Sequence, residues 1–193
     1  MKSIINIILI IFIILIFLKI FQDKIFYYIN STKVLSKVDN KYYIVRNVKH
    51  KQKSADTLAH INLRVEKLLN HLKTQKTHIE NIQLLLERYD RNNLVENINL
   101  DNTTYIINKG SKLAVCLTTR DYKEDIYDIN SLMFVIIHEL SHIGSKSYGH
   151  NKEFKDFFTF LLNRSIHLGI YKYVDYSVNP QEYCGIEINS SPL

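Results

Sequence analysis

The stretch SLMFVIIHELSHIG, residues 131–144, decides how this chain of 193 residues is interpreted. It carries a complete H-E-x-x-H motif at His138, Glu139 and His142, behind an apolar run that predicts a buried central helix. Positions i and i+4 of a helix lie on one face, so His138 and His142 can hold one zinc ion together. Glu139 projects about 100° further around the helix, where it can reach a metal-bound water. The motif therefore predicts a zinc site with Glu139 as general base.

Zinc in a catalytic site usually has three protein ligands and one open position. His150 follows the motif by eight residues, after Gly144 and Gly149, and is the candidate third ligand. Glu153 is the rival, because carboxylates also bind zinc.

The remaining periodicity predicts an α+β fold. Apolar residues recur at helical spacing over residues 58–72, 78–88 and 154–166, and Ser54 is a candidate cap for the first of these helices. Asp128 or Asn130 can cap the H-E-x-x-H helix, and Gly144 can end it. Residues 103–107 and 113–117 alternate like strands around a Gly-containing turn, which predicts a short antiparallel hairpin. The motif resembles that of H-E-x-x-H zinc peptidases, in which a strand edge beside the active helix usually holds the substrate backbone. This resemblance would give that role to the second run, the last one before the motif helix.

The N-terminal segment predicts a membrane anchor. Residues 4–21 are nearly all Ile, Leu and Phe, and they reach the length needed to cross a bilayer if Lys19 extends toward the headgroups. A cleaved signal peptide is the alternative, but no small-residue cleavage site follows. We expect an uncleaved single-pass anchor at residues 4–21, a basic stalk at 22–50, and a folded domain at 51–193.

Charge suggests how the anchor is oriented. The chain has a formal net charge of +6, and lysines are frequent just after the apolar segment. The positive-inside rule then places the domain in the cytosol, whereas glycosylation sequons at Asn30, Asn102, Asn163 and Asn189 would argue the opposite. The basic stalk could contact anionic lipid headgroups or be a solvated linker. No motif for nucleic-acid binding is present.

The chain has two cysteines, Cys116 and Cys184, and no C-x-x-C pair. This spacing excludes a zinc site built from cysteines. Both lie in β-like runs, so we expect buried thiols. A single disulfide would be possible only in an oxidising compartment.

With these pieces placed, residues 55–190 resemble the WLM and SprT-like zinc metallopeptidases, also called minigluzincins. The resemblance rests on a leading helix, the hairpin with Asn108-Lys109-Gly110, the motif from His138 to His142, and Gly149-His150 followed by Phe154. It implies a zincin-like domain in which His138, His142 and His150 bind Zn²⁺. The loop before His150 is slightly longer than is usual in WLM proteins.

The resemblance implies a zinc-dependent peptidase that acts on a protein or peptide substrate. A tyrosine of the tail, Tyr173, Tyr176 or Tyr183, could stabilise the oxyanion. Two other functions are compatible with the sequence: an inactive zinc-binding module of the same fold, and a membrane tether whose basic stalk binds lipids. Glu139 argues against the first, because a structural zinc site needs no base.

Overall fold

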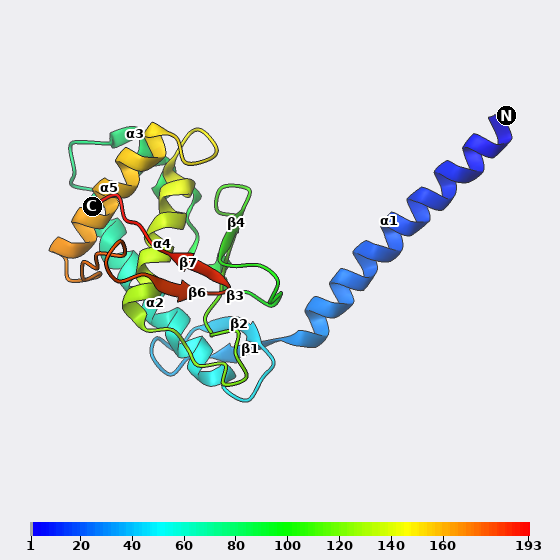
Figure 1. The fold of residues 1–193 in the computed structure, drawn as a ribbon, viewed down its shortest axis with the longest axis horizontal. Helices are drawn as coiled ribbons and strands as arrows, with labels where there is room; N and C mark the ends of the chain where they lie inside the picture. Colours follow the sequence, from blue (N-terminus) through cyan, green and yellow to red (C-terminus); the bar gives the residue numbers. More distant parts are fainter. Residues whose placement is uncertain (1) are drawn as a thin grey trace.

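The computed structural model describes residues 2–193, with side chains from residue 5 onward. It has an α+β fold with small sheets and one long N-terminal helix, as predicted (Figure 1). The helices are α1 (Lys2–Asn30), α2 (Lys51–Leu72), α3 (Ile79–Arg88), the short 3-10 helix η1 (Arg91–Asn93), α4 (Ile129–Gly144) and α5 (Lys152–His167). The strands are β1 (Ser31–Leu35), β2 (Tyr42–Arg46), β3 (Leu94–Glu96), β4 (Tyr105–Ile107), β5 (Lys112–Val115), β6 (Gln181–Tyr183) and β7 (Ile186–Ile188).

Helix α4, which carries the motif, lies at the centre of the domain and packs against α2, α3 and α5 (Figure 1). Asp128 caps it as predicted, accepting hydrogen bonds from the backbone N–H groups of the first turn. Beyond that turn every residue of α4 is buried except Val135, His138 and His142. Their spacing of three and four residues places them on one face. The helix is therefore held on most sides by the core and leaves this single face open.

For α2 and α3 the predicted helix start can be compared with the one in the structure. Helix α3 matches the predicted range of 78–88 to within one residue. The proposed cap of α2 is wrong: the helix begins at Lys51, so Ser54 lies inside its first turn and is buried.

The sheet beside α4 has the strand order β3-β5-β4. Strands β4 and β5 form the predicted antiparallel hairpin, but β3 pairs with β5 in parallel, so the sheet is mixed. The run predicted to bind a peptide by strand addition contains β5. That prediction is wrong, because both edges of β5 are already paired and only an edge strand can accept another strand.

Residues 31–46 do not form the expected stalk. Strands β1 and β2 pair antiparallel and pack against α2, and Tyr43 and Val45 belong to the hydrophobic core. The guanidinium of Arg46 is buried and forms an ion pair with the buried carboxylate of Glu96, at 3.1 Å. Removing one partner of a buried ion pair leaves an uncompensated charge and costs about 3–5 kcal/mol. The folded domain therefore begins near Ser31 rather than at residue 51.

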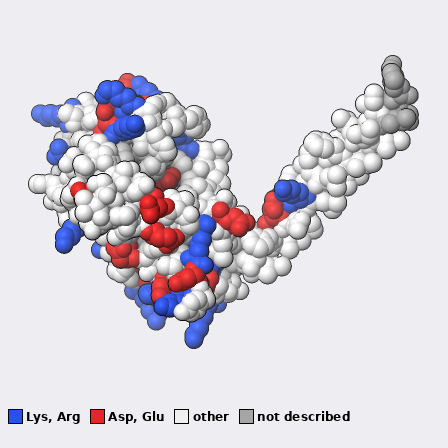
Figure 2. Space-filling model, viewed as in Figure 1, with Lys and Arg blue, Asp and Glu red and all other residues white. Residues whose placement is uncertain are grey.

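Helix α1 projects away from the domain as a rod (Figure 1). Its segment Ile5–Asn30 is long and apolar enough to cross a membrane. The most apolar stretch of this segment has no residue buried against the rest of the protein. Figure 2 shows the rod almost free of charged groups except near its domain end. This segment lies near the N-terminus, where a signal sequence would have the same properties.

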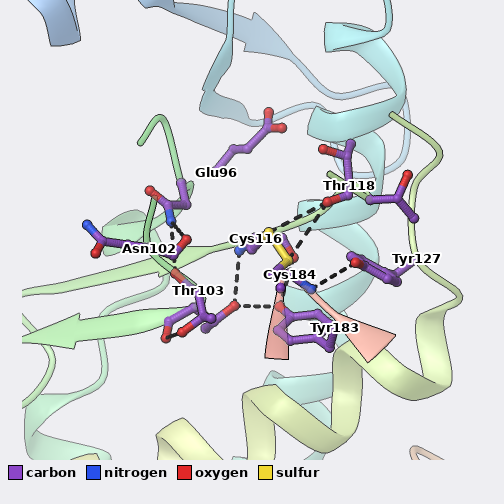
Figure 3. The surroundings of a disulfide bond; sticks show 12 residues. Glu96, Asn102, Thr103, Cys116, Thr118, Tyr127, Tyr183 and Cys184 are labelled. Carbon is purple, nitrogen blue, oxygen red and sulfur yellow. Dashed lines mark hydrogen bonds between the residues drawn. A yellow bond between two sulfur atoms is a disulfide. The ribbon is translucent and has the colours of Figure 1, made fainter. Parts of the chain in front are cut away.

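The two cysteines are bonded to each other, so the prediction of buried thiols is wrong. Cys116 follows β5 and Cys184 lies in the turn between β6 and β7, and their Cα atoms are 6.5 Å apart (Figure 3). This separation lies within the range that disulfides require. Because 68 residues separate the two cysteines in the sequence, only the tertiary fold brings them together.

The disulfide ties the C-terminal hairpin to the central sheet. Among the described strands, β6 and β7 pair only with each other. The buried side chain of Tyr183 adds two contacts to the body of the domain: its hydroxyl donates to the carbonyl of Cys116 at 2.7 Å and lies 2.5 Å from the hydroxyl of Thr104. The hairpin crosses in front of α4, and the C-terminus lies near α5 (Figure 1).

Candidate metal centre

The fold brings three imidazoles together on the open face of α4. His138 and His142 come from the helix itself, and His150 comes from the loop that leads into α5. One nitrogen from each of the three rings lies within 4.8 Å of the other two. The Nε2 atom of His150 is 3.1 Å from Nε2 of His138 and 3.1 Å from Nε2 of His142.

These distances suit one shared metal ion. Two ligands at 2.0–2.1 Å from a tetrahedral zinc ion are separated from each other by about 3.3 Å. Nε2 of His150 lies 3.1 Å from Nε2 of each of the other two histidines, which is close to this separation. The donor set of three imidazoles therefore fits zinc in both chemistry and spacing.

Phe154, in the first turn of α5, packs against all three histidine rings. Its ring stacks on His142 at 4.1 Å between centroids and meets His138 and His150 edge-on at 4.9 and 4.8 Å. Burial, together with the neighbouring histidines, lowers the pKa of His138 to about 3. Burial and the nearby His150 lower the pKa of His142 to about 4. His138 and His142 are therefore neutral near pH 7, which is the form that binds metals.

Glu139 lies beside the imidazoles, with 8 % of its surface exposed. Its position on α4 is one residue after His138, so it turns away from the ligand face and lines a neighbouring cavity. Burial raises the pKa of its carboxyl to about 8. A carboxyl whose pKa is shifted toward neutrality by burial can exchange protons near physiological pH.

The end of α4 is held by two cations. Lys109, in the β4–β5 turn, donates from Nζ to the carbonyls of His142, Ser145 and Ser147, at 3.2, 2.9 and 2.5 Å. Arg88 donates to the carbonyl of Ser145 as well, at 3.0 Å. Positive charges at a helix C-terminus satisfy its free carbonyls and oppose the negative end of its dipole. Lys109 thus connects the second histidine to the loop that carries the third.

Glu153 holds this loop and is not part of the histidine cluster. Its carboxylate accepts hydrogen bonds from the backbone N–H of Lys146 at 2.8 Å, from the hydroxyl of Ser147 at 2.7 Å and from the amide of Asn81 at 3.0 Å. Burial opposes the charged form, but these hydrogen bonds outweigh it and lower the pKa of Glu153 to about 2. Of the two candidate third ligands, only His150 lies with His138 and His142.

Sequence reasoning missed the roles of Lys109, Arg88 and Asn81. In the sequence Lys109 belongs only to a predicted turn, and no motif marks Arg88 or Asn81. All three act across more than thirty positions of sequence, and no local pattern marks such contacts.

A cavity of about 590 Å³ opens beside the histidines. The face of α4 that carries Val135 and His138 forms one side of it, the start of α5 forms a second, and the C-terminal hairpin with the tail forms a third. Its volume lies in the range of small-molecule and peptide side-chain pockets. The site therefore combines a candidate metal centre, a buried carboxyl and a space for a ligand.

No tail tyrosine presents a free hydroxyl to this site. Tyr183 lines the cavity, but its hydroxyl is occupied by the carbonyl of Cys116 and by Thr104. Tyr176 is fully buried and packs against Phe134, and Tyr173 is 46 % exposed; neither lines the cavity. The described residues thus leave the predicted tyrosine donor without a candidate in this conformation.

The structural class is an α+β domain in which two histidines of a buried central helix meet a third from the following loop, and the chain is similar to three viral proteins. The chain is 34% identical over 170 residues to the uncharacterized protein R325 of Acanthamoeba polyphaga mimivirus, which covers 84% of this chain and 85% of the relative. It is 26% identical over 155 residues to the uncharacterized protein 136R of Invertebrate iridescent virus 6, covering 75% of this chain and 84% of the relative. The chain therefore belongs to the same protein family as the mimivirus protein.

A shorter match, 35% identical over 89 residues, links the chain to the uncharacterized protein 042R of Invertebrate iridescent virus 3. It covers 45% of this chain and 54% of that relative. No protein-family model matches the chain. No solved structure matches it either.

Proposed function

We propose that this protein is a membrane-anchored, zinc-dependent metallopeptidase that hydrolyses peptide bonds. The observation that carries the proposal is the cluster of three imidazoles, two from α4 and one from the loop before α5, next to the buried carboxyl of Glu139. Imidazole ligands suit zinc, and three of them leave one position of a tetrahedral ion for water or substrate. The resemblance to WLM and SprT-like peptidases, which rests on the same residues, points to the same chemistry.

A zinc ion bound here would supply Lewis acidity, polarising the scissile carbonyl and lowering the pKa of a bound water to about 7. His138, His142 and His150 would hold it through neutral rings, kept in place by Phe154. Glu139 takes a proton from the attacking water and passes it to the leaving amine. Its burial supports this role. Burial raises the pKa of the carboxyl to about 8, so it can take up and release a proton near pH 7 more readily than an exposed carboxyl.

The peptide backbone can be held by β4, which is an edge of the central sheet. Thr103 and Thr104 lead into this strand and line the cavity together with Glu139. A peptide paired with the free edge of β4 would run past the carboxyl of Glu139, which is the arrangement that strand addition requires. This assignment replaces β5, whose edges are both occupied.

The disulfide bears on which side of the membrane the domain lies. Disulfides persist in oxidising compartments and are rare in the cytosol. We propose that α1 is an uncleaved anchor and that it holds the domain on the oxidising side of the membrane, against the orientation expected from the lysines. The four sequon asparagines are all exposed. Expression in animal cells should therefore give a glycosidase-sensitive mass increase. An unglycosylated domain that added protease digests in sealed microsomes would place it in the cytosol instead.

The catalytic proposal is tested with the full chain in detergent. The metal content of the purified protein should be about one zinc per chain, as a three-ligand site implies. Glu139→Gln should keep the metal and lose hydrolysis of peptide substrates, by at least about a hundredfold for loss of a general base. Glu87→Gln, an exposed glutamate on α3, is the matched control and should leave both properties unchanged. Equal cleavage by the Glu139→Gln protein and the wild type would sink the mechanism.

The third ligand is tested in the same way. His150→Ala should lose most of the bound zinc, whereas His60→Ala, at an exposed position of α2, should retain it. Unchanged zinc content in His150→Ala would show that the ligand is misassigned. Zinc binding without hydrolysis of any peptide would leave the protein a zinc-binding module of this fold.

A further inference from the structure

The cavity beside the metal centre has an apolar interior and a charged rim. Its floor is one turn of α4 just before His138, contributed by Phe134 and Val135. The ring of Phe158, from α5, closes one side and packs against both Phe134 and His138. Phe134 and Phe158 are each 5 % exposed, so the surface facing the cavity is hydrocarbon held in a fixed position.

The opposite wall is the C-terminal hairpin. Ile186 and Ile188, both on β7, line the cavity, and Ile186 is 50 % exposed although it is a large apolar residue. The hairpin is kept in place by the disulfide of Cys184 and by the hydroxyl contacts of Tyr183. The hairpin is therefore fixed to the central sheet within a few residues of Ile186 and Ile188.

Charged groups other than the metal centre and Glu139 lie only at the opening. Lys155 and Glu187 line the cavity but are exposed to solvent, so each remains hydrated. A charged side chain inserted between Val135, Phe158 and Ile188 would lose its water without gaining a counter-charge.

We infer that this cavity selects an apolar side chain, of the size of Leu or Phe, at a residue next to the scissile bond, with Val135 and Ile188 as specificity-determining residues. The inference rests on the proposed function and names the substrate class of that same site. Burying a Leu or Phe side chain in such a pocket should favour a peptide by about tenfold to a hundredfold over one with Ser or Asp at the same position.

The test separates recognition from cleavage. Fluorescent eight-residue peptides, each with Leu, Phe, Ser or Asp at one varied position, are titrated against the zinc-supplemented full chain carrying Glu139→Gln, and binding is read by anisotropy. At one position, Leu or Phe should bind about tenfold to a hundredfold more tightly than Ser or Asp. Equal binding of all four peptides at every position, or no binding at all, overturns the inference.

Two variants in the same background locate the pocket. Val135→Phe narrows the cavity beside His138 and should remove the preference for Phe over Ser at the selected position. Ile188→Ala removes part of the hairpin wall and should reduce the preference for Leu by about tenfold. Val178→Ala, at a residue of the tail that is 70 % exposed and does not line the cavity, is the control. If the Ile188 variant fails to fold in a thermal melt, Val135→Phe alone decides, and an unchanged preference there refutes the pocket.

Cleavage of the same peptides by the wild-type chain is the separate arm. Apolar-selective binding without cleavage by the wild type would sink the proposed peptidase while supporting the pocket. Cleavage without apolar selectivity in either arm would support the peptidase and sink the pocket. Cleavage beside the same apolar residue that binding selects supports both.

Discussion

The disulfide between Cys116 and Cys184 makes a prediction whose size follows from the fold. It closes a loop spanning 68 residues, and it holds a hairpin that pairs with no other described strand. Replacing both cysteines with serine removes this constraint and leaves the metal ligands untouched. We therefore expect a large loss of stability with metal binding retained.

The magnitude comes from the entropy of the unfolded chain. Closing a loop of this length lowers that entropy enough to stabilise the fold by about 4.4 kcal/mol in the chain-entropy model, and observed effects are typically about 2–4 kcal/mol. For a domain of this size, each kcal/mol corresponds to about 2–4 °C in the unfolding temperature. Loss of the disulfide should thus lower the unfolding temperature by about 10 °C.

Thermal unfolding of the full chain in detergent, with and without a reductant, measures the effect. Reductant should destabilise the wild type toward the melting temperature of the Cys116→Ser/Cys184→Ser variant, and the variant itself should not respond. Alkylation of the denatured wild type should label the cysteines only after reduction. Labelling before reduction, or equal melting temperatures for the two proteins, would refute the pairing and the orientation derived from it.

Three further predictions concern the support of the site. Gly144→Ala should cost about 1–3 kcal/mol in urea unfolding, since a Cβ there would lie 2.9 Å from the carbonyl oxygen of Asn81 and collide with the ring of Phe157. Lys109→Met should weaken zinc binding by about tenfold to a hundredfold in a chelator competition, because it frees the loop that carries the third ligand; unchanged affinity would show that the loop is held without it. The pKa of Glu153 is depressed from 4.5 to about 2, so its contribution is fully present above about pH 4.5 and is lost as the pH falls toward 2. The stability difference between wild type and Glu153→Gln should therefore be about 1.5–3 kcal/mol at pH 7 and shrink by pH 3, and a difference that does not change with pH would contradict this.

The helical part of the fold and the placement of His138 and His142 on one face could be anticipated from the sequence because their signals are local. The cap at Asp128, the end of α4 at Gly144 and the β4–β5 hairpin all depend on residues within a few positions of one another. The spacing of His138 and His142 is also a local signal, because a helix places positions i and i+4 on the same face.

The failures of prediction share a different cause. The segment at 31–46 looked like a linker because its strands are short and several lysines lie in and between them. Arg46 and Tyr43 are nevertheless buried against elements that follow later in the chain. The strand chosen for peptide binding was wrong because β3, which covers its second edge, was not detected. The cysteines were expected to be buried thiols because each lies in a β-like run. Their pairing was missed because no rule of spacing predicts a bond between residues 68 positions apart.

The sequence by itself determined that this chain carries an apolar N-terminal helix and a motif helix with two histidines and a glutamate on defined faces, because helical geometry converts spacing directly into position. Only the tertiary structure decided that His150 rather than Glu153 completes the cluster, that Cys116 joins Cys184, and that the C-terminal hairpin forms a wall of the cavity. Each of these depends on contacts between segments distant in the chain. Such contacts form when the whole core packs, and packing leaves no periodic trace in the residues that it brings together.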